Sequence, residues 1–119
     1  MVAAMSASHA PLVTAIAFQL SAALENYQMH IDGLKDPWSQ RRQHDLVSKV
    51  FDEVRMLKGA LPELSVPMVE VFIRHVELMK GLWLSGSNQE AGDMDELRRR
   101  HGAAVGAMRE RCLRVFSHA

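Results

Sequence analysis

Residues 65–85 read SVPMVEVFIRHVELMKGLWLS, and this is the periodic segment of the chain with the narrowest polar face. Its apolar residues recur at alternating steps of three and four, which is the spacing of one face of an amphipathic helix. Ser65 suits an N-cap, and Pro67 falls in the first turn, where its missing N–H costs little. We therefore predict a helix whose inward seam consists of Val69, Phe72, Val76, Met79 and Trp83.

Three further segments repeat this spacing, from Pro11 to Leu34, from Pro37 to Leu61 and from Asp93 to Val115. Asp36 can cap the second helix with Pro37 at its first position, and Asp93 with Glu96 resembles a capping box. The expected seams are Val13, Ile16, Leu20, Leu24, Tyr27, Ile31 and Leu34 in the first helix; Val47, Val50, Val54, Leu57 and Leu61, widened by Leu46 and Phe51, in the second; and Met94, Leu97, His101, Ala104, Met108, Cys112 and Val115 in the last.

These segments predict an all-α fold. No stretch alternates with period two over the length of a strand, and short connections between long helices favour an up-down-up-down four-helix bundle. We expect one domain over residues 1–119, with residues 1–7 as a loose tail. The least ambiguous boundary is a polar turn near Asn88.

The composition is that of a globular protein without a strong net electrostatic field. Of the 119 residues, 48% are apolar and 24% charged, and 14 basic side chains balance 14 acidic ones. The single cysteine, Cys112, lies in an expected seam and suits a reducing compartment. Arg98, Arg99 and Arg100 point about 100° apart around a helix, so they predict a salt-bridged face rather than a nucleic-acid surface.

The N-terminal stretch carries no charged residue before Glu25. A secretory signal would need basic residues there, and the polar Thr14, Gln19 and Ser21 interrupt the run that a membrane span requires. We interpret it as a helix packed in protein and expect a cytoplasmic location, with no membrane or nucleic-acid partner.

Two histidines, His75 and His101, fall on apolar faces. They are equally far in sequence from Asn88, so they lie at one height if the last two helices fold back there. Phe51 and Leu20 would complete that layer. Facing side chains of a bundle can hold a metal or cofactor, but no further ligand lines up here, so two hydrogen-bonded core histidines are the favoured interpretation.

The apolar surface exceeds what one bundle needs. A second stripe on the third helix contains Val71, Leu78 and Leu82, and a weaker one on the first contains Phe18 and Met29. Gly102 and Gly106 in the last helix invite close approach of another helix, with Leu113 beyond them. A wider internal core is the alternative to an interface. The candidate partner interface is therefore Phe18, Met29, Val71, Leu78, Leu82, Gly102, Gly106 and Leu113.

Residues 55–60 (RMLKGA) resemble the His-x-Leu-Lys-Gly motif of histidine phosphotransfer domains, which are also helical bundles. Arg55 stands where that family carries its phosphorylated histidine, and Pro62 follows soon after. The resemblance implies a degenerate relative without phosphotransfer activity.

No nucleophile, base and orienting group can be assembled from this sequence, so we do not expect an enzyme, and we expect neither a metal nor a cofactor. The first hypothesis is an interaction module that self-associates as a dimer or binds a partner helix. A metal- or cofactor-binding bundle using His75 and His101 is the second, and the phosphotransfer relative is the third.

Overall fold

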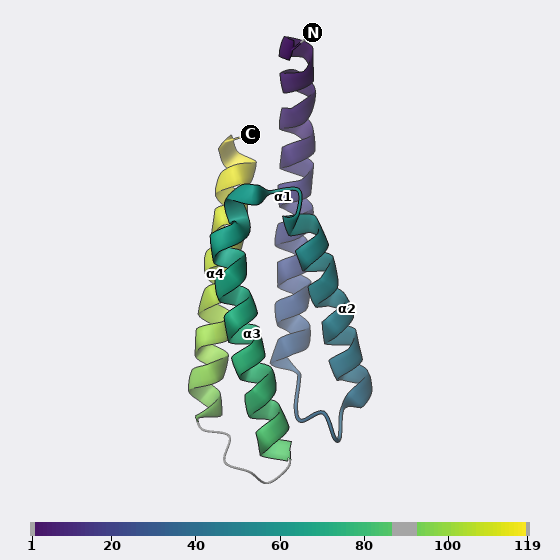
Figure 1. Ribbon diagram of the computed structural model, residues 1–119, viewed down its shortest axis with the longest axis vertical. Helices are drawn as coiled ribbons and strands as arrows, with labels where there is room; N and C mark the ends of the chain where they lie inside the picture. The colour runs from purple at the N-terminus through teal and green to yellow at the C-terminus, as the bar shows by residue number, and fades with distance from the viewer. Residues whose placement is uncertain (1, 87–92, 119) are drawn as a thin grey trace.

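The computed structural model describes residues 2–86 and 93–118, and all regular elements in these ranges are helices. They are α1 (Val2–Asp32), α2 (Arg41–Lys58), the short 3-10 helix η1 (Pro62–Leu64), α3 (Ser65–Gly86) and α4 (Met94–His118). The four long helices lie alongside one another (Figure 1). The prediction of an all-helical chain is confirmed. None of these helices combines the length and hydropathy needed to cross a bilayer.

Two helix starts differ from those predicted. α1 begins at Val2, so the expected loose tail is helical and Pro11 lies inside the helix; the alanines of this stretch favour a helix. α2 begins at Arg41 rather than at Pro37. The Asp36 carboxylate instead accepts hydrogen bonds from the backbone N–H and the hydroxyl of Ser39, which closes a turn before the helix.

The predicted start of α4 is confirmed. The Asp93 carboxylate accepts a hydrogen bond of 3.2 Å from the backbone N–H of Glu96, as an N-cap does. At the start of α3, the Ser65 hydroxyl donates to the carbonyl of Pro62, and Pro67 lies in the first turn. The expected turn around Asn88 lies outside the described residues.

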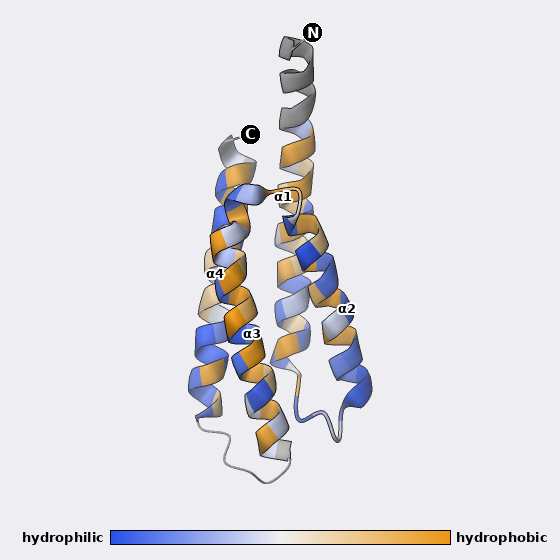
Figure 2. Ribbon diagram, in the orientation of Figure 1, coloured by the Kyte–Doolittle hydropathy of each residue, from blue (hydrophilic) through white to orange (hydrophobic). Residues whose placement is uncertain are grey.

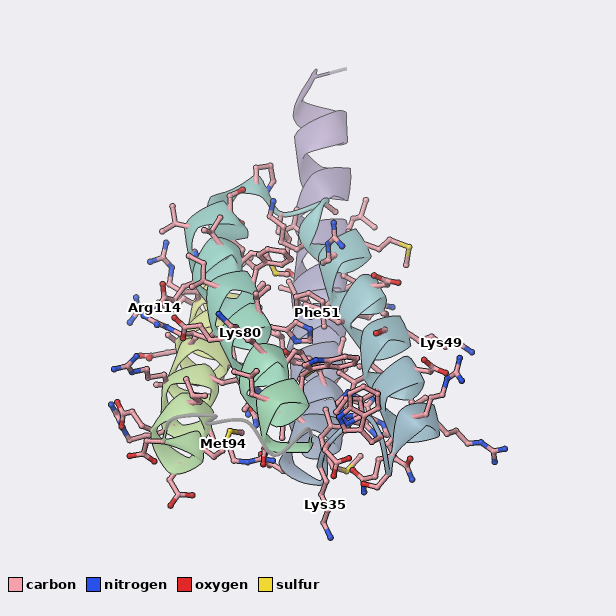
Figure 3. The ribbon with its side chains drawn as sticks, turned by 60° about the horizontal axis from the view of Figure 1, so that its bottom comes forward. Lys35, Lys49, Phe51, Lys80, Met94 and Arg114 are labelled. Carbon is pink, nitrogen blue, oxygen red and sulfur yellow. The ribbon has the colours of Figure 1, made fainter. Side chains whose placement is uncertain are left out.

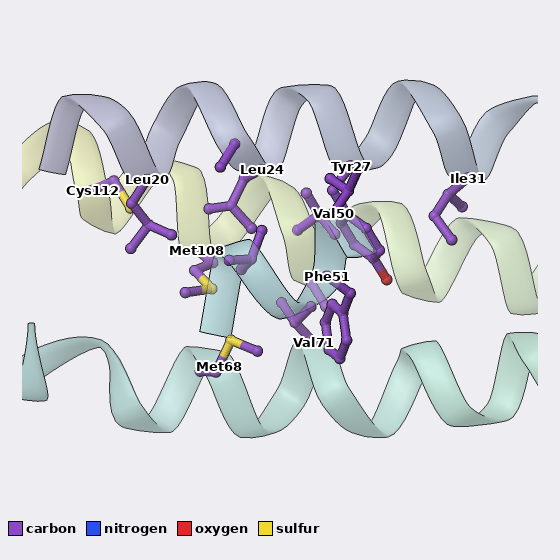
Figure 4. Close-up of a cluster of buried hydrophobic side chains, with 14 of the residues drawn as sticks. Leu20, Leu24, Tyr27, Ile31, Val50, Phe51, Met68, Val71, Met108 and Cys112 are labelled. Carbon is purple, nitrogen blue, oxygen red and sulfur yellow. The ribbon is translucent and has the colours of Figure 1, made fainter. Parts of the chain in front are cut away.

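The helices pack unevenly. α4 packs along both α1 and α3, and α1 also packs along α2, whereas α2 and α3 touch only sparsely. The core therefore lies among all four helices, with α1 packed along α2 and α4, and one edge, between α2 and α3, is open. Figure 4 shows this core from the side, with Met68 and Val71 of α3 pointing toward Leu24 and Phe51. The predicted seams of α1, α2 and α4 all contribute to it except Leu46, which is exposed.

α3 is rotated relative to the prediction. Its buried side is the stripe Met68, Val71, His75, Leu78 and Leu82, here called the inner face of α3. The predicted seam has the same spacing shifted by one residue, which turns a helix by about 100°. Most of that seam points outward: Val69, Phe72, Val76 and Trp83 are 47 to 58% exposed, and Met79 is half-buried.

Gly81 lies against side chains of α4. A Cβ atom at this position would lie 2.7 Å from Cδ1 of Leu97 and 2.9 Å from Sδ of Met94, closer than van der Waals contact permits. Gly102 and Gly106 differ, because no described atom lies within 4 Å of a Cβ built there. A side chain at position 81 would therefore require the side chains of Leu97 and Met94 to shift.

Candidate functional site

A polar cluster lies in the middle of the core. The hydroxyl oxygen of Tyr27, on α1, lies 2.6 Å from Nδ1 of His75 on α3 and 2.7 Å from Nε2 of His101 on α4. Phe51, from α2, lies near the middle of the molecule (Figure 3). Its ring stacks on His75 with centroids 4.3 Å apart and planes 2° apart. The prediction that the two histidines share a layer is confirmed, but Tyr27 rather than Leu20 completes it.

The hydrogen bonds of this cluster assign the protons. Tyr27 has one hydroxyl proton, so it donates to one imidazole and accepts from the other. Nδ1 of His101 is buried without a hydrogen-bond partner among the described residues. A buried N–H without an acceptor is rarer than an unused lone pair, so this atom is best left unprotonated. His101 then donates from Nε2 to the Tyr27 oxygen, and Tyr27 donates to Nδ1 of His75.

Burial keeps the cluster neutral near pH 7. Loss of solvation lowers the pKa of His75 to about 4. The pKa of His101 is also lowered to about 4, first by burial and then by the nearby His75. The same burial raises the pKa of Tyr27 above its usual value of 10. The three side chains therefore act as neutral hydrogen-bonding groups that join α1, α3 and α4.

The histidine nitrogens of the cluster do not point at a common position where an ion could bind. Nδ1 of His75 and Nε2 of His101 both face the Tyr27 hydroxyl, which lies between the two rings. Across the described parts of the chain, no three His, Cys, Asp or Glu side chains are grouped so as to hold a metal. The role of Tyr27 was missed in the sequence, although a tyrosine in a buried seam needs a partner for its hydroxyl.

The exposed apolar side of α3 is the largest departure from the predicted interface. Val71 and Leu78 are 0% and Leu82 is 5% exposed, so these three predicted interface residues belong to the core instead. Their places on the surface are taken by residues whose exposure ranges from 43 to 58%. We call this set the outer face of α3: Val69, Phe72, Ile73, Val76 and Trp83. Figure 2 shows hydrophobic residues along most of the length of α3.

The two ends of the outer face have different shapes. At its C-terminal end Trp83 packs on Trp38, with ring centroids 4.3 Å apart, and both indoles are at least half exposed. At its N-terminal end a groove of about 480 Å³ opens between α2 and α3. The groove is lined by Arg55, Lys58, Gly59, Ser65, Met68, Val69 and Phe72.

The remaining predicted interface residues lie on the opposite side of the molecule. Met29, Gly102 and Gly106 line a shallow groove of about 830 Å³ between α1 and α4, and Phe18 and Leu113 are exposed on the same two helices. The rim of this groove is polar, and Arg109 lies 3.6 Å from the carboxylate of Glu25 across it. The sequence thus grouped Met29, Gly102 and Gly106, which the structure places around one groove, on a different surface from the outer face of α3.

Arg98 of α4 links this helix to the C-terminal end of α1. Its guanidinium donates hydrogen bonds to the backbone carbonyls of Ile31 and Leu34, at the C-terminal end of α1. The Ile31 carbonyl also accepts from the backbone N–H of Leu34, which lies just after the end of α1, and a cation at this helix end complements the helix dipole. Arg99 and Arg100 pair with Glu96, as a salt-bridged face requires. Arg55, at the phosphotransfer-like motif, is exposed near the end of α2.

Comparison with known proteins gives no match: no protein-family model, no curated protein and no solved structure resembles this chain at a significant level. The site must therefore be interpreted from its own geometry.

Proposed function

We propose that this protein is a non-enzymatic, cytoplasmic interaction module, a single-domain up-down-up-down four-helix bundle that binds a protein surface through the outer face of α3. One observation carries the proposal: α3 is apolar on two sides, and the outer one stays about half exposed although the inner one is buried in the core. Contiguous exposed apolar surface of this kind marks interaction sites in soluble proteins.

The open edge between α2 and α3 supports this assignment. α3 leans on α4 and leaves its side toward α2 largely uncovered, so Phe72 and Val76 remain about half exposed although an adjacent helix lies beside them. Phe51 reaches toward this edge and stacks on both His75 and Phe72. A helix laid on the outer face would complete the packing that α2 leaves unfinished.

The chemistry of the buried cluster fits a structural role better than a catalytic one. Tyr27, His75 and His101 satisfy one another, and their displaced pKa values hold them neutral rather than near the values that general acid–base work at pH 7 needs. Their effect is to fix the rotation of α3, and this rotation presents the outer face.

Site-specific photo-crosslinking in the cells that naturally produce the protein tests the proposal. A photoreactive amino acid at Val76 should yield a defined covalent adduct, identified by mass spectrometry. The same group at Glu53, an exposed position on α2, serves as the matched control and should yield none. Adducts at neither Val76 nor Ile73 would contradict the proposal, as would equal adducts at Glu53.

A further inference from the structure

We propose that the outer face of α3 is covered by the same face of a second copy of this chain, in a two-fold dimer whose axis crosses α3 near Val76. This inference rests on the proposed function, since it names the partner of that surface. A two-fold arrangement pairs one patch with itself, so a single apolar surface satisfies both subunits.

The exposed area is sufficient for such a dimer. Six side chains, the five of the outer face and Trp38, are each 43 to 58% exposed. With fully exposed side chains of roughly 150–250 Å², they offer on the order of 500 Å² per copy. Complete coverage in two copies would bury at most about 1,000 Å² of apolar side chain, which is the low end for a specific interface before any polar rim is added.

The order of side-chain sizes along α3 selects an antiparallel pairing. Val69 is small and lies near the N-terminal end of the outer face, whereas Trp83 is large and lies near its C-terminal end. With Val76 at the axis, Val69 of each copy faces Trp83 of the other, so a large side chain meets a small one at both ends. A parallel pairing would instead oppose Trp83 to Trp83 and Val69 to Val69, so that two large side chains meet at one end and two small ones at the other.

The groove at the N-terminal end of the face fits the partner's indole. Val69 and Phe72 line this groove of about 480 Å³, and Arg55 and Lys58 of α2 form its basic side. A two-fold axis perpendicular to α3 keeps the α2 edges of both copies on the same side of the interface. Trp83 of each copy, which leans toward Trp38 on that edge, then meets the groove of the other. There the indole gains apolar contact and a cation near its ring.

Charge does not oppose this pairing. The chain has equal numbers of acidic and basic residues, so two copies carry no net repulsion. Lys80 lies on the outer face itself, one helical turn after Val76, and its flexible stem can carry the ammonium past apolar neighbours into solvent.

Cysteine crosslinking tests the geometry directly. Two copies of Val76→Cys should be joined by a short bismaleimide, because the axis brings these positions together. Val69→Cys is the matched control: its two copies would lie about 20 Å apart in the antiparallel dimer and should not be joined. Cys112 is buried, with its pKa raised to about 11, so the unmodified chain should not react.

Sedimentation equilibrium over a dilution series measures the affinity. The wild-type chain should dimerise, and Trp83→Ala should raise the dissociation constant about 30-fold or more, as the loss of an aromatic anchor seated in a pocket does. Leu113→Ala, which removes an exposed apolar residue of α4 away from the face, should leave the constant unchanged. Circular dichroism would verify that each variant keeps its helix content.

The outcomes separate this inference from the proposed function. A monomer at all concentrations, with no crosslink at Val76→Cys, overturns the second copy as partner; if the photo-crosslink at Val76 then identifies a different protein, the interaction module stands. Crosslinks at Val69→Cys as strong as those at Val76→Cys overturn the antiparallel arrangement. Loss of every adduct in cells overturns both.

Discussion

The hydroxyl oxygen of Tyr27 lies 2.7 Å from Nε2 of His101, although 74 positions of sequence separate the two residues. The same oxygen lies 2.6 Å from Nδ1 of His75, so one hydroxyl satisfies two imidazoles from two other helices. A buried polar group that loses its partner costs more than the hydrogen bond itself contributes. This contact therefore penalises any rotation of α3 that would take His75 away from Tyr27.

Removal of the hydroxyl should destabilise the fold. Tyr27→Phe leaves a ring of nearly the same size but no partner for Nδ1 of His75 or Nε2 of His101. We expect the free energy of unfolding, measured by urea denaturation, to fall by about 1–3 kcal/mol. Removing a second member, as in Tyr27→Phe with His101→Leu, should cost less than the sum of the two single changes. Strict additivity would show that the three side chains do not act together.

Both histidines should carry the Nε2–H tautomer, so that His101 donates to Tyr27 and His75 accepts from it. We expect His101 to carry its proton on Nε2 at pH 7, because its buried Nδ1 has no described partner. His75 should then carry its proton on Nε2 as well, leaving Nδ1 to accept from Tyr27. Long-range ¹H–¹⁵N correlation spectra distinguish the two tautomers of each ring. A protonated Nδ1 in His101 would reverse the direction of the hydrogen bonds.

Stability should fall with acid in a defined window. The unfolded chain binds protons at histidine below about pH 6.5, whereas His75 and His101 bind them in the fold only near pH 4. Between these values the unfolded state holds more protons, so the free energy of unfolding decreases as the pH falls. For His101 the full loss is about 3 kcal/mol. His101→Leu should flatten the profile measured by denaturation from pH 7 to pH 4, and an unchanged slope would contradict the burial of this ring.

Replacement by alanine should lower the stability of the protein at Gly81 and raise it at Gly102 and Gly106. Gly81→Ala should lower the melting temperature, because its Cβ would overlap Leu97 and Met94. Gly102→Ala and Gly106→Ala should each stabilise the protein by up to about 1 kcal/mol, since both lie inside a helix with open space around them. Differential scanning calorimetry of the three variants measures this contrast. Destabilisation by all three would mean that α4 is approached by something on its outer side.

The two faces of α3 should differ sharply in mutational cost. Leu78→Ala removes a fully buried side chain and should lower the free energy of unfolding by about 2–5 kcal/mol. Val76→Ala, on the outer face, should change it by less than about 0.5 kcal/mol at concentrations where the chain is monomeric. Urea denaturation of both variants provides the comparison. Equal costs would indicate that the outer face is also covered within the molecule.

Most of the fold could be predicted from local signals. The periodic apolar seams of α1, α2 and α4 lie in or against the core apart from Leu46, and Asp93 caps α4 as its spacing with Glu96 suggests. The shared layer of His75 and His101 could also be predicted, because helix register relates positions along adjacent helices. Such signals are local or periodic, so they do not depend on how the rest of the chain packs.

The rotation of α3 could not be predicted in this way, because its two apolar stripes have identical spacing and differ by one residue. The stripe that is buried contains one polar side chain, His75. By hydrophobic periodicity alone, a polar residue makes that stripe the poorer candidate for the core. In the folded molecule that residue selects the stripe, since its Nδ1 finds the Tyr27 hydroxyl and its ring stacks on Phe51. Both partners come from other helices. A buried hydrogen bond depends on where those partners lie in space, and the amphipathic spacing of a single helix carries no information about that.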